Sequence, residues 1–130
     1  MGVEVERVKR ESIESTLKEH QIQISEVQFF ELFAKGNKLG ARGLTGIEEV
    51  IDGIESLYHS LEVLPLVEPD VLKYANLIYR HGLKDIIDSI ILASALRFSE
   101  GLATLDQGIR KAYEGGVIRR LNPNLKILKL

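Results

Sequence analysis

The stretch Gly82–Gln107, GLKDIIDSIILASALRFSEGLATLDQ, decides the fold of this chain. Apolar and small side chains recur through its first half at helical spacing and form one wide face: Ile87, Ile90, Ile91, Ser94, Ala95 and Phe98. Glu100 and Gly101 end the predicted helix, and residues 102–105 form a short apolar run typical of a buried parallel strand. Asp106 then stands at the carboxyl end of that strand, where open α/β sheets bind their ligands.

Two further carboxylates open the predicted helix. Asp85 and Asp88 are three residues apart, so they are neighbours on the helix surface. The helix dipole and the free N–H groups of a first turn favour negative charge at this position. We therefore expect an acidic surface at the start of the helix.

Composition limits the class of protein. The 130 residues are 45% hydrophobic, which suits a single domain spanning residues 1–130. The absence of cysteine excludes disulfides, thiolate zinc sites and cysteine nucleophiles, and it fits a reducing cytoplasm. The charged start MGVEVERVKRE is unlike a signal peptide, and no apolar run has transmembrane length. A net charge of −2 gives no overall attraction to nucleic acid, so any such contact needs a local basic patch.

The remaining chain alternates predicted helices and short strands. An amphipathic helix is predicted over residues 4–19 and a strand over residues 21–24. Ser25 with Gln28 forms a capping box for the next helix, which we expect to fray near Gly36, and Thr45 with Glu48 forms a second capping box.

Beyond that helix the alternation continues to the end of the chain. The sequence predicts a strand near residues 63–66, a helix from Pro69 to a stop at Gly82, a helix over residues 107–114, and a last strand near residues 127–128. This alternation predicts an α/β fold of three layers, α/β/α, with a parallel sheet.

Three acidic residues stand in apolar surroundings: Glu31, Asp88 and Asp106. Each has an ordinary structural interpretation. Glu31 could pair with Lys35 on the helix surface, Asp88 could serve the first turn of its helix, and Asp106 could cap the helix that follows. Together they suggest a site, because isolated carboxylates are costly to bury, and a carboxylate cluster selects Mg²⁺ or Mn²⁺. Such ions activate water and neutralise phosphate charge.

Other catalytic groups compete poorly with these carboxylates. The three histidines, His20, His59 and His81, are scattered near predicted helix ends, where each suits the helix dipole better than a metal ion. No phosphate-binding loop of the GxxxxGK type is present, and the glycines at positions 36, 40, 43 and 46 do not match a dinucleotide fingerprint.

The run KDIIDSIILASAL followed by ATLDQGI resembles the C-terminal half of PIN-domain ribonucleases, the family that includes VapC-type toxins. In that family an Asp opens a helix of the form D-x-x-I-x-A-x-A, here from Asp88, and a later strand ends in T-x-D, here Thr104 to Asp106. ISEVQFFELFAKG resembles the helix that carries the family's metal-binding Glu, here Glu31. The resemblance covers residues 20–114.

The resemblance implies a Mg²⁺- or Mn²⁺-dependent nuclease that acts on RNA, with an antitoxin as a protein partner if it is a toxin. Glu31, Asp88 and Asp106 would be catalytic and hold the metal, with Asp85 as a further carboxylate and Thr104 in support. Phosphate contacts would come from five basic residues, for which an ordinary solvated face is an equally good interpretation: Lys35, Lys38, Arg42, Arg110 and Lys111.

One departure from the family pattern affects both fold and function. The family begins with a central apolar strand ending in an Asp that binds metal, and nothing before Ile22 resembles such a strand. The chain is therefore either a fragment or a short form with a weakened site. We expect the gap to be filled by homo-oligomerisation or by another segment such as residues 2–5, and we expect metal affinity to be reduced.

Two alternatives to an active ribonuclease remain. One is a catalytically inactive PIN-like module that binds RNA or a protein. The other is a plain α/β interaction domain in which the carboxylates only cap helices.

Overall fold

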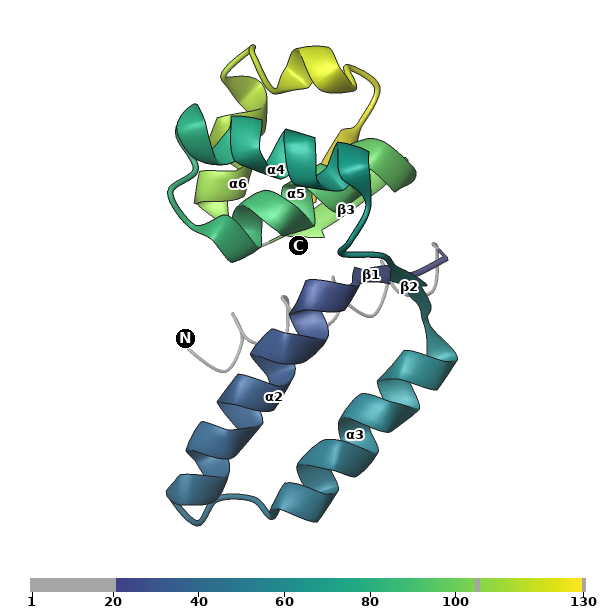
Figure 1. Ribbon diagram of the computed structural model, residues 1–130, viewed down its shortest axis with the longest axis vertical. Helices are drawn as coiled ribbons and strands as arrows, with labels where there is room; N and C mark the ends of the chain where they lie inside the picture. The colour runs from purple at the N-terminus through teal and green to yellow at the C-terminus, as the bar shows by residue number, and fades with distance from the viewer. Residues whose placement is uncertain (1–20, 105, 130) are drawn as a thin grey trace, which may run out of the picture.

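The computed structural model describes residues 21–104 and 106–129, and it consists of a long helical hairpin and a more compact lobe (Figure 1). The expected helix over residues 4–19 and the segment of residues 2–5 lie outside the described residues. The elements in chain order are β1 (Gln23–Ser25), α2 (Glu26–Ala41), α3 (Ile47–Ser60), β2 (Glu62–Leu64), α4 (Pro69–Arg80), α5 (Ile86–Phe98), β3 (Gly101–Thr104), α6 (Gln107–Glu114), a 3₁₀ turn (Arg119–Leu121) and β4 (Lys126–Lys129).

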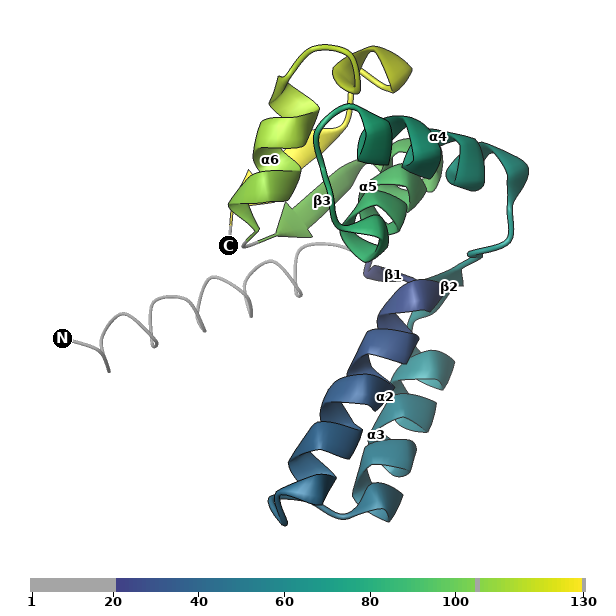
Figure 2. The same cartoon turned by 60° about the vertical axis from the view of Figure 1, so that its left-hand side comes forward.

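The strands confirm the predicted α/β class, and both strand pairs are parallel. β1 pairs with β2 in the register Gln23 to Glu62, and β3 pairs with β4 in the register Gly101 to Lys126. Among residues 21–104 and 106–129 these pairs form two separate two-stranded sheets rather than one continuous sheet. The hairpin of α2 and α3 extends from the first pair, α5 and α6 pack against the second pair, and α4 packs on α5 (Figures 1 and 2).

Helix α5 is the centre of the core. Leu92 and Ala93 are fully buried, and α4 packs along α5. The core cluster combines side chains of α4, α5, α6 and the C-terminal segment: Val71, Ala75, Ile78, Leu83, Leu92, Ala93, Ala95, Leu96, Ile109, Tyr113, Ile118 and Leu125. No helix in the described part of the chain is long and apolar enough to cross a bilayer.

The predicted inward face of α5 is partly wrong. The most buried positions of α5 include Ser89, Leu92 and Leu96, which the predicted face omits, whereas Ile91 and Phe98 are only half-buried. Ser89 is buried without an unmet hydrogen bond because its hydroxyl donates to the carbonyl oxygens of Leu83 at 3.1 Å and Asp85 at 2.8 Å. The spacing of apolar residues predicted the helix, but it could not show which of its faces pack against other elements.

The helix starts test the predicted capping boxes. The first is confirmed, because the Gln28 side chain accepts a hydrogen bond from the Ser25 N–H at 2.8 Å. The second is wrong by one residue: Gly46 is the N-cap of α3, and the Thr45 hydroxyl instead donates to the Glu49 carboxylate at 3.1 Å.

The expected fraying near Gly36 is also wrong, because α2 continues to Ala41. Gly36 is buried at the crossing of α2 and α3, where a Cβ would lie 2.9 Å from Val50 Cγ2 and closer still to Cγ1. The glycine therefore permits close helix packing, and the ring of Phe29 meets that of Tyr58 edge-on at 5.5 Å along the same seam.

Gly36→Ala is expected to destabilise the fold by about 1–3 kcal/mol, because the stiff Val50 side chain cannot yield and the hairpin must open. The measurement is urea unfolding followed by circular dichroism. Gly53→Ala in α3 is the matched control, since a Cβ added at Gly53 would meet no atom within 4 Å. The free energy of unfolding of the control should rise by about 0.5–1 kcal/mol, because Ala has a higher helix propensity than Gly. If both variants lose the same stability, the packing argument is wrong.

Candidate functional site

Asp88 lies at the centre of the candidate site, in the first turn of α5. It is half-buried, and its backbone N–H donates to Asp85 Oδ1 at 3.1 Å. Asp85 is the N-cap of the helix, and the same Oδ1 also accepts from the Ile87 N–H at 2.9 Å. Asp85 is thus held rigidly through one carboxylate oxygen at the start of α5.

Asp106 caps α6, as its structural interpretation predicted. Its Oδ1 accepts from the N–H groups of Gly108 at 2.7 Å and Ile109 at 3.3 Å. The Thr104 hydroxyl accepts from the Asp106 N–H at 2.9 Å, which fixes the turn between β3 and α6. Both backbone bonds use Oδ1, so capping leaves Oδ2 available for another role.

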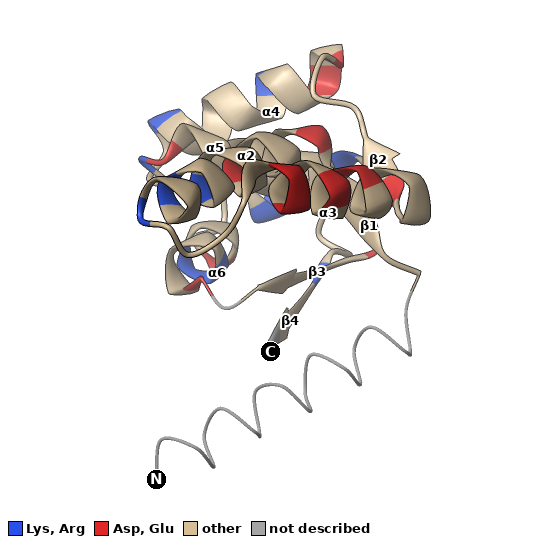
Figure 3. Ribbon diagram, turned by 90° about the horizontal axis from the view of Figure 1, so that it is seen from below, with Lys and Arg blue, Asp and Glu red and all other residues tan. Residues whose placement is uncertain are grey.

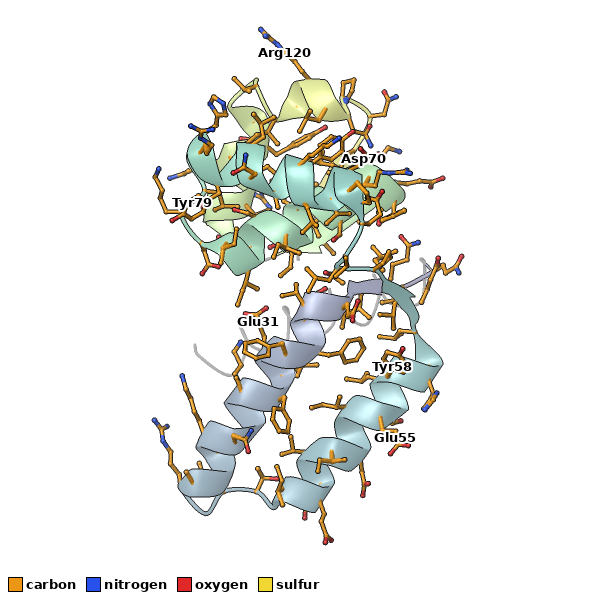
Figure 4. The ribbon with its side chains drawn as sticks, viewed as in Figure 1. Glu31, Glu55, Tyr58, Asp70, Tyr79 and Arg120 are labelled. Carbon is orange, nitrogen blue, oxygen red and sulfur yellow. The ribbon has the colours of Figure 1, made fainter. Side chains whose placement is uncertain are left out.

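The electrostatics of Asp88 show that acidic residues converge on it. Burial first, and then the negative charges of Asp85 and Asp106, raise the pKa of the Asp88 carboxyl to about 6. A hydrogen-bonding contribution from the Asp106 carboxyl and the weaker effect of the Glu31 charge act in the same direction. Carboxylates of α2, of the start of α5 and of the turn before α6 therefore act on Asp88, and Figure 4 shows Glu31 on the part of α2 nearest the lobe.

The raised pKa of Asp88 predicts a pH dependence of stability. The pKa is about 6 in the fold against an ordinary value of 3.8, so the native state binds more protons between these values. The contribution of Asp88 to the free energy of unfolding therefore falls as the pH rises from about 4 to about 6, and it does not return at higher pH. After solvent screening this loss is on the order of 1 kcal/mol. Urea unfolding at pH 4 and pH 7 should show this loss in the wild type and not in Asp88→Asn. If the free energies of unfolding of the wild type and of Asp88→Asn differ by the same amount at both pH values, this prediction is wrong.

The donor chemistry of the cluster suits a hard divalent cation, but its spacing is loose. Asp and Glu oxygens are the ligands that Mg²⁺ and Mn²⁺ prefer, and repulsion among them, seen at Asp88, is what a cation relieves. Yet among the residues that the structure describes, no three acidic or histidine side chains are close enough to hold one ion together. The assignment of Glu31, Asp85, Asp88 and Asp106 as metal ligands stays a prediction.

The predicted phosphate-binding residues occupy two helices. Lys35 and Lys38 are exposed on α2, and the exposed Arg42 directly follows its last residue, so at helical spacing from Glu31 they continue its face toward the hairpin tip. Figure 3 shows these basic segments apart from the acidic segments of α3. On α6, Arg110 is half-buried and Lys111 is exposed, one turn after Asp106.

These five basic residues are not neutralised by their described neighbours. Within the described ranges, the ion pairs are those of Arg97 with Glu68 at 3.9 Å and Asp70 at 3.3 Å. The expected pair of Glu31 with Lys35 is therefore absent there, so this pairing does not occupy the Glu31 carboxylate.

Sequence reasoning did not predict the cavity beside α5, although Ile91, Ser94, Ala95 and Phe98 of its lining belong to the helix face expected from the sequence. This cavity, of about 890 Å³, lies between β1 and β3, and α5 forms part of its wall. Its polar lining includes Ser25 and Ser94, whose hydroxyl oxygens are 3.5 Å apart and buried, and Ser99, which donates to Gln23 Oε1 at 2.7 Å. Serines within apolar runs gave no signal of this role.

Comparison with known proteins identifies the family. The family model of the PIN domain matches residues 3–115, most of the chain. Comparisons with curated proteins and with solved structures find no match. The matched range includes α2, α5 and α6, which carry the converging carboxylates. The chain therefore belongs to the PIN-domain family, a nuclease superfamily whose members generally use divalent metal ions.

Proposed function

We propose that this chain is a metal-dependent ribonuclease of the PIN type and acts as the VapC-like toxin of a toxin–antitoxin pair. The observation that carries the proposal is the position of Asp88, where burial first, and then the nearby charges of Asp85, Asp106 and Glu31, raise the pKa of its carboxyl to about 6. Such convergence costs stability, so a structural role alone explains it poorly.

The roles follow from the contacts. Asp88 and Asp106 would hold Mg²⁺ or Mn²⁺, with Glu31 completing the set from α2 and Asp85 adding negative charge. Thr104 positions Asp106 through its 2.9 Å hydrogen bond to the backbone. A bound ion would supply an activated water and neutralise charge on the scissile phosphate.

The substrate proposal is single-stranded RNA. Lys35, Lys38 and Arg42 follow Glu31 by four, seven and eleven residues, and a helix rises about 1.5 Å per residue, so they lie roughly 6–16 Å from Glu31 along the helix axis. This row can contact successive phosphates on one side of the cut, and Arg110 with Lys111 can contact those near Asp106.

An antitoxin partner, or a second copy of the chain, would need an apolar surface to bind. The hairpin offers one, because large apolar side chains remain exposed on it: Phe30 is 66% exposed, Leu44 69% and Ile51 48%. Exposed apolar patches of this kind mark protein interaction sites.

An inactive PIN-like binding module is the second candidate. It is favoured by the loose spacing of the carboxylates, since no three of the described ones lie within reach of one ion. The RNA-binding form of this module differs from the ribonuclease in cleavage and shares its RNA binding.

The experiment is cleavage of a labelled single-stranded RNA by the purified chain with Mn²⁺ or Mg²⁺, with EDTA, and with Asp106→Asn. Asp52→Asn, an exposed residue of α3, is the charge-matched control. Cleavage that needs metal and Asp106 but not Asp52 supports the ribonuclease. RNA binding without cleavage supports the module, and neither activity would contradict both.

RNA binding itself gives a further prediction. Replacing Lys35, Lys38 and Arg42 together with Ala should weaken binding and lower the slope of log K against log salt by about 2, at roughly 0.7 per lost phosphate contact on a single strand. Fluorescence anisotropy at four salt concentrations measures the slope. Lys73→Ala on α4, also exposed, should leave the slope unchanged, and an equal change there would make the effect one of net charge alone.

A further inference from the structure

A second cavity, of about 380 Å³, lies between the end of α4 and helix α6. The turn after α4 contributes His81, Gly82 and Leu83 to its lining, and α6 contributes a face that includes Lys111 and Ala112. Figure 1 shows the connection from α4 to α5 beside α6. Small-molecule sites in proteins have volumes of about 300–1,000 Å³. The cavity is therefore large enough to hold one nucleotide-sized group.

The buried part of the lining is apolar. Leu83 is 8% exposed and Ile118 is 2% exposed, and both line the cavity. Gly82 and Gly108 line it without a side chain, and a Cβ added at Gly82 would meet no atom within 4 Å. A flat ring can therefore lie against apolar side chains and bare backbone.

An imidazole and an ammonium group border the same cavity. His81 and Lys111 are both exposed lining residues, and neither forms an ion pair with another residue in the ranges 21–104 and 106–129. Each also suits the C-terminal end of its helix, where positive charge is favoured. That structural role does not require a cavity between the two side chains, so the cavity needs a further explanation.

The cavity opens within the most basic part of the chain. Residues 107–126 contain five basic residues and one acidic residue, although the whole chain has a net charge of −2. Arg119 and Arg120 directly follow the lining residue Ile118, and both are exposed. A local excess of Lys and Arg on one segment is the electrostatic signature of a surface that binds a polyanion.

The cavity is also close to the candidate site. Leu83 lies two residues before Asp85, and Gly108 lies two residues after Asp106. A Cβ added at Gly108 would lie 3.0 Å from Asp106 Oδ1 and 3.6 Å from Leu83 Cδ1. Because a helix rises about 1.5 Å per residue, the lining of α6 begins roughly 3 Å beyond Asp106 along the helix axis. A group bound in the cavity is therefore a near neighbour of the carboxylates.

We propose that this cavity binds the nucleobase of one nucleotide of an RNA strand, beside the phosphate that is cut, and that Lys111 binds the phosphate of the same nucleotide. The position beside the cut rests on the proposed function. The flat face of a base suits Leu83 and Ile118, and a His side chain such as His81 is a common stacking partner of unpaired bases. An apolar lining bordered by an ammonium group fits a nucleotide better than a wholly apolar or wholly anionic ligand.

The first experiment titrates the full 130-residue chain, in EDTA, with uridine or adenosine monophosphate and follows the backbone amides by NMR. We expect saturable shifts at the lining residues Gly82, Gly108 and Gly115. Ribose phosphate, which lacks the base, and the nucleosides, which lack the phosphate, should each bind about tenfold more weakly, the size of one stacking contact or one charged hydrogen bond. Equal binding of ribose phosphate, or no shift at these glycines with either nucleotide, would overturn the proposal.

Variants test the individual contacts. His81→Ala and Lys111→Ala should each lower the affinity for the nucleotide about tenfold. Arg80→Ala is the matched control, because Arg80 is exposed beside His81 but does not line the cavity, and it should leave the affinity unchanged. An equal loss in Arg80→Ala would make the effect one of net charge and overturn the proposal.

Ala112→Leu tests the cavity itself, since the larger side chain occupies the space that the base needs. We expect this variant to lose nucleotide binding while its urea unfolding midpoint shows that it is folded. Full affinity in the folded variant would overturn the proposal. If the variant does not fold, His81→Ala and Lys111→Ala still decide the question.

Cleavage of labelled RNA separates the cavity from the proposed function. Ala112→Leu should raise the KM for RNA more than it lowers kcat, because the cavity binds the substrate and does not touch the reacting atoms. Nucleotide binding by a chain that cleaves no RNA would refute the ribonuclease and leave the nucleotide site standing. Cleavage with an unchanged KM in Ala112→Leu would remove the cavity from the path of the RNA and leave the ribonuclease standing.

Discussion

Asp88→Asn is expected to lower metal-dependent RNA cleavage by about 10²–10³-fold, because a bound divalent ion contributes several kcal/mol to such reactions and Asp88 is the carboxylate on which the cluster converges. Asn keeps the shape of the side chain and removes its charge. Initial rates at saturating Mn²⁺, compared with those at low Mn²⁺, separate a lost ligand from a general loss of fold.

The same substitution should stabilise the protein at pH 7. Partial burial, together with repulsion from Asp85 and Asp106, makes the ionised Asp88 unfavourable in the fold, and the neutral amide removes that cost. A variant that is more stable and far less active would be the signature of a functional carboxylate. Asp70→Asn, on α4 and ion-paired to Arg97 at 3.3 Å, is the control and should lose neither activity nor more than about 1 kcal/mol. Full activity in Asp88→Asn would remove Asp88 from the site.

Leu92→Ala is expected to destabilise the fold by about 2–5 kcal/mol, the largest effect on stability that we predict. Leu92 is fully buried in α5 and belongs to the core cluster that joins α4, α5, α6 and the C-terminal segment, so the truncation leaves a cavity in this core. For a chain of this size the unfolding midpoint should fall by roughly 10 °C or more.

Leu72→Ala on α4 is the matched control, because the same atoms are removed from a side chain that is 46% exposed. It should cost less than about 1 kcal/mol, and urea unfolding of both variants gives the comparison. If the two variants lose stability equally, α5 is not the centre of the core.

Much of the fold was predictable because local chemistry determines it. Pro69 begins α4 and Gly82, with a φ of 143°, follows its end, as the helix signals predicted. Asp106 caps α6, and β4 falls on the expected residues. These features depend on a few neighbouring residues, so the sequence contains what is needed to infer them.

The errors arise where distant parts of the chain decide the outcome. Gly36 favours fraying in an isolated helix. In the fold, however, Val50 of α3 packs against it, and the absence of a Cβ lets the two helices approach closely. Ile91 and Phe98 belong to an apolar face, yet the cavity beside β1 and β3 leaves them half-covered. Neither partner can be inferred from spacing along one helix.

The candidate site divides in the same way. The local signal that placed Asp85 and Asp88 at a helix start was sufficient to predict the first-turn position of Asp88, but it did not identify Asp85 as the N-cap. The approach of Asp106 and Glu31 to Asp88 depends on how α2 and α6 are placed against α5, and only the structure shows its effect on the Asp88 pKa. The resemblance of the motifs to PIN domains supplied what spacing could not.

The hairpin of α2 and α3 is attached to the rest of the chain near one of its ends. Both of its helices meet the rest of the chain at the short β1–β2 pair, where the Leu66 N–H also donates to Glu26 Oε2 at 3.1 Å (Figure 2). Glu31 lies near the attached end of the hairpin, while Lys38, Arg42 and the exposed Leu44 lie toward its far tip. A small rotation at the strands therefore moves the tip much farther than it moves Glu31.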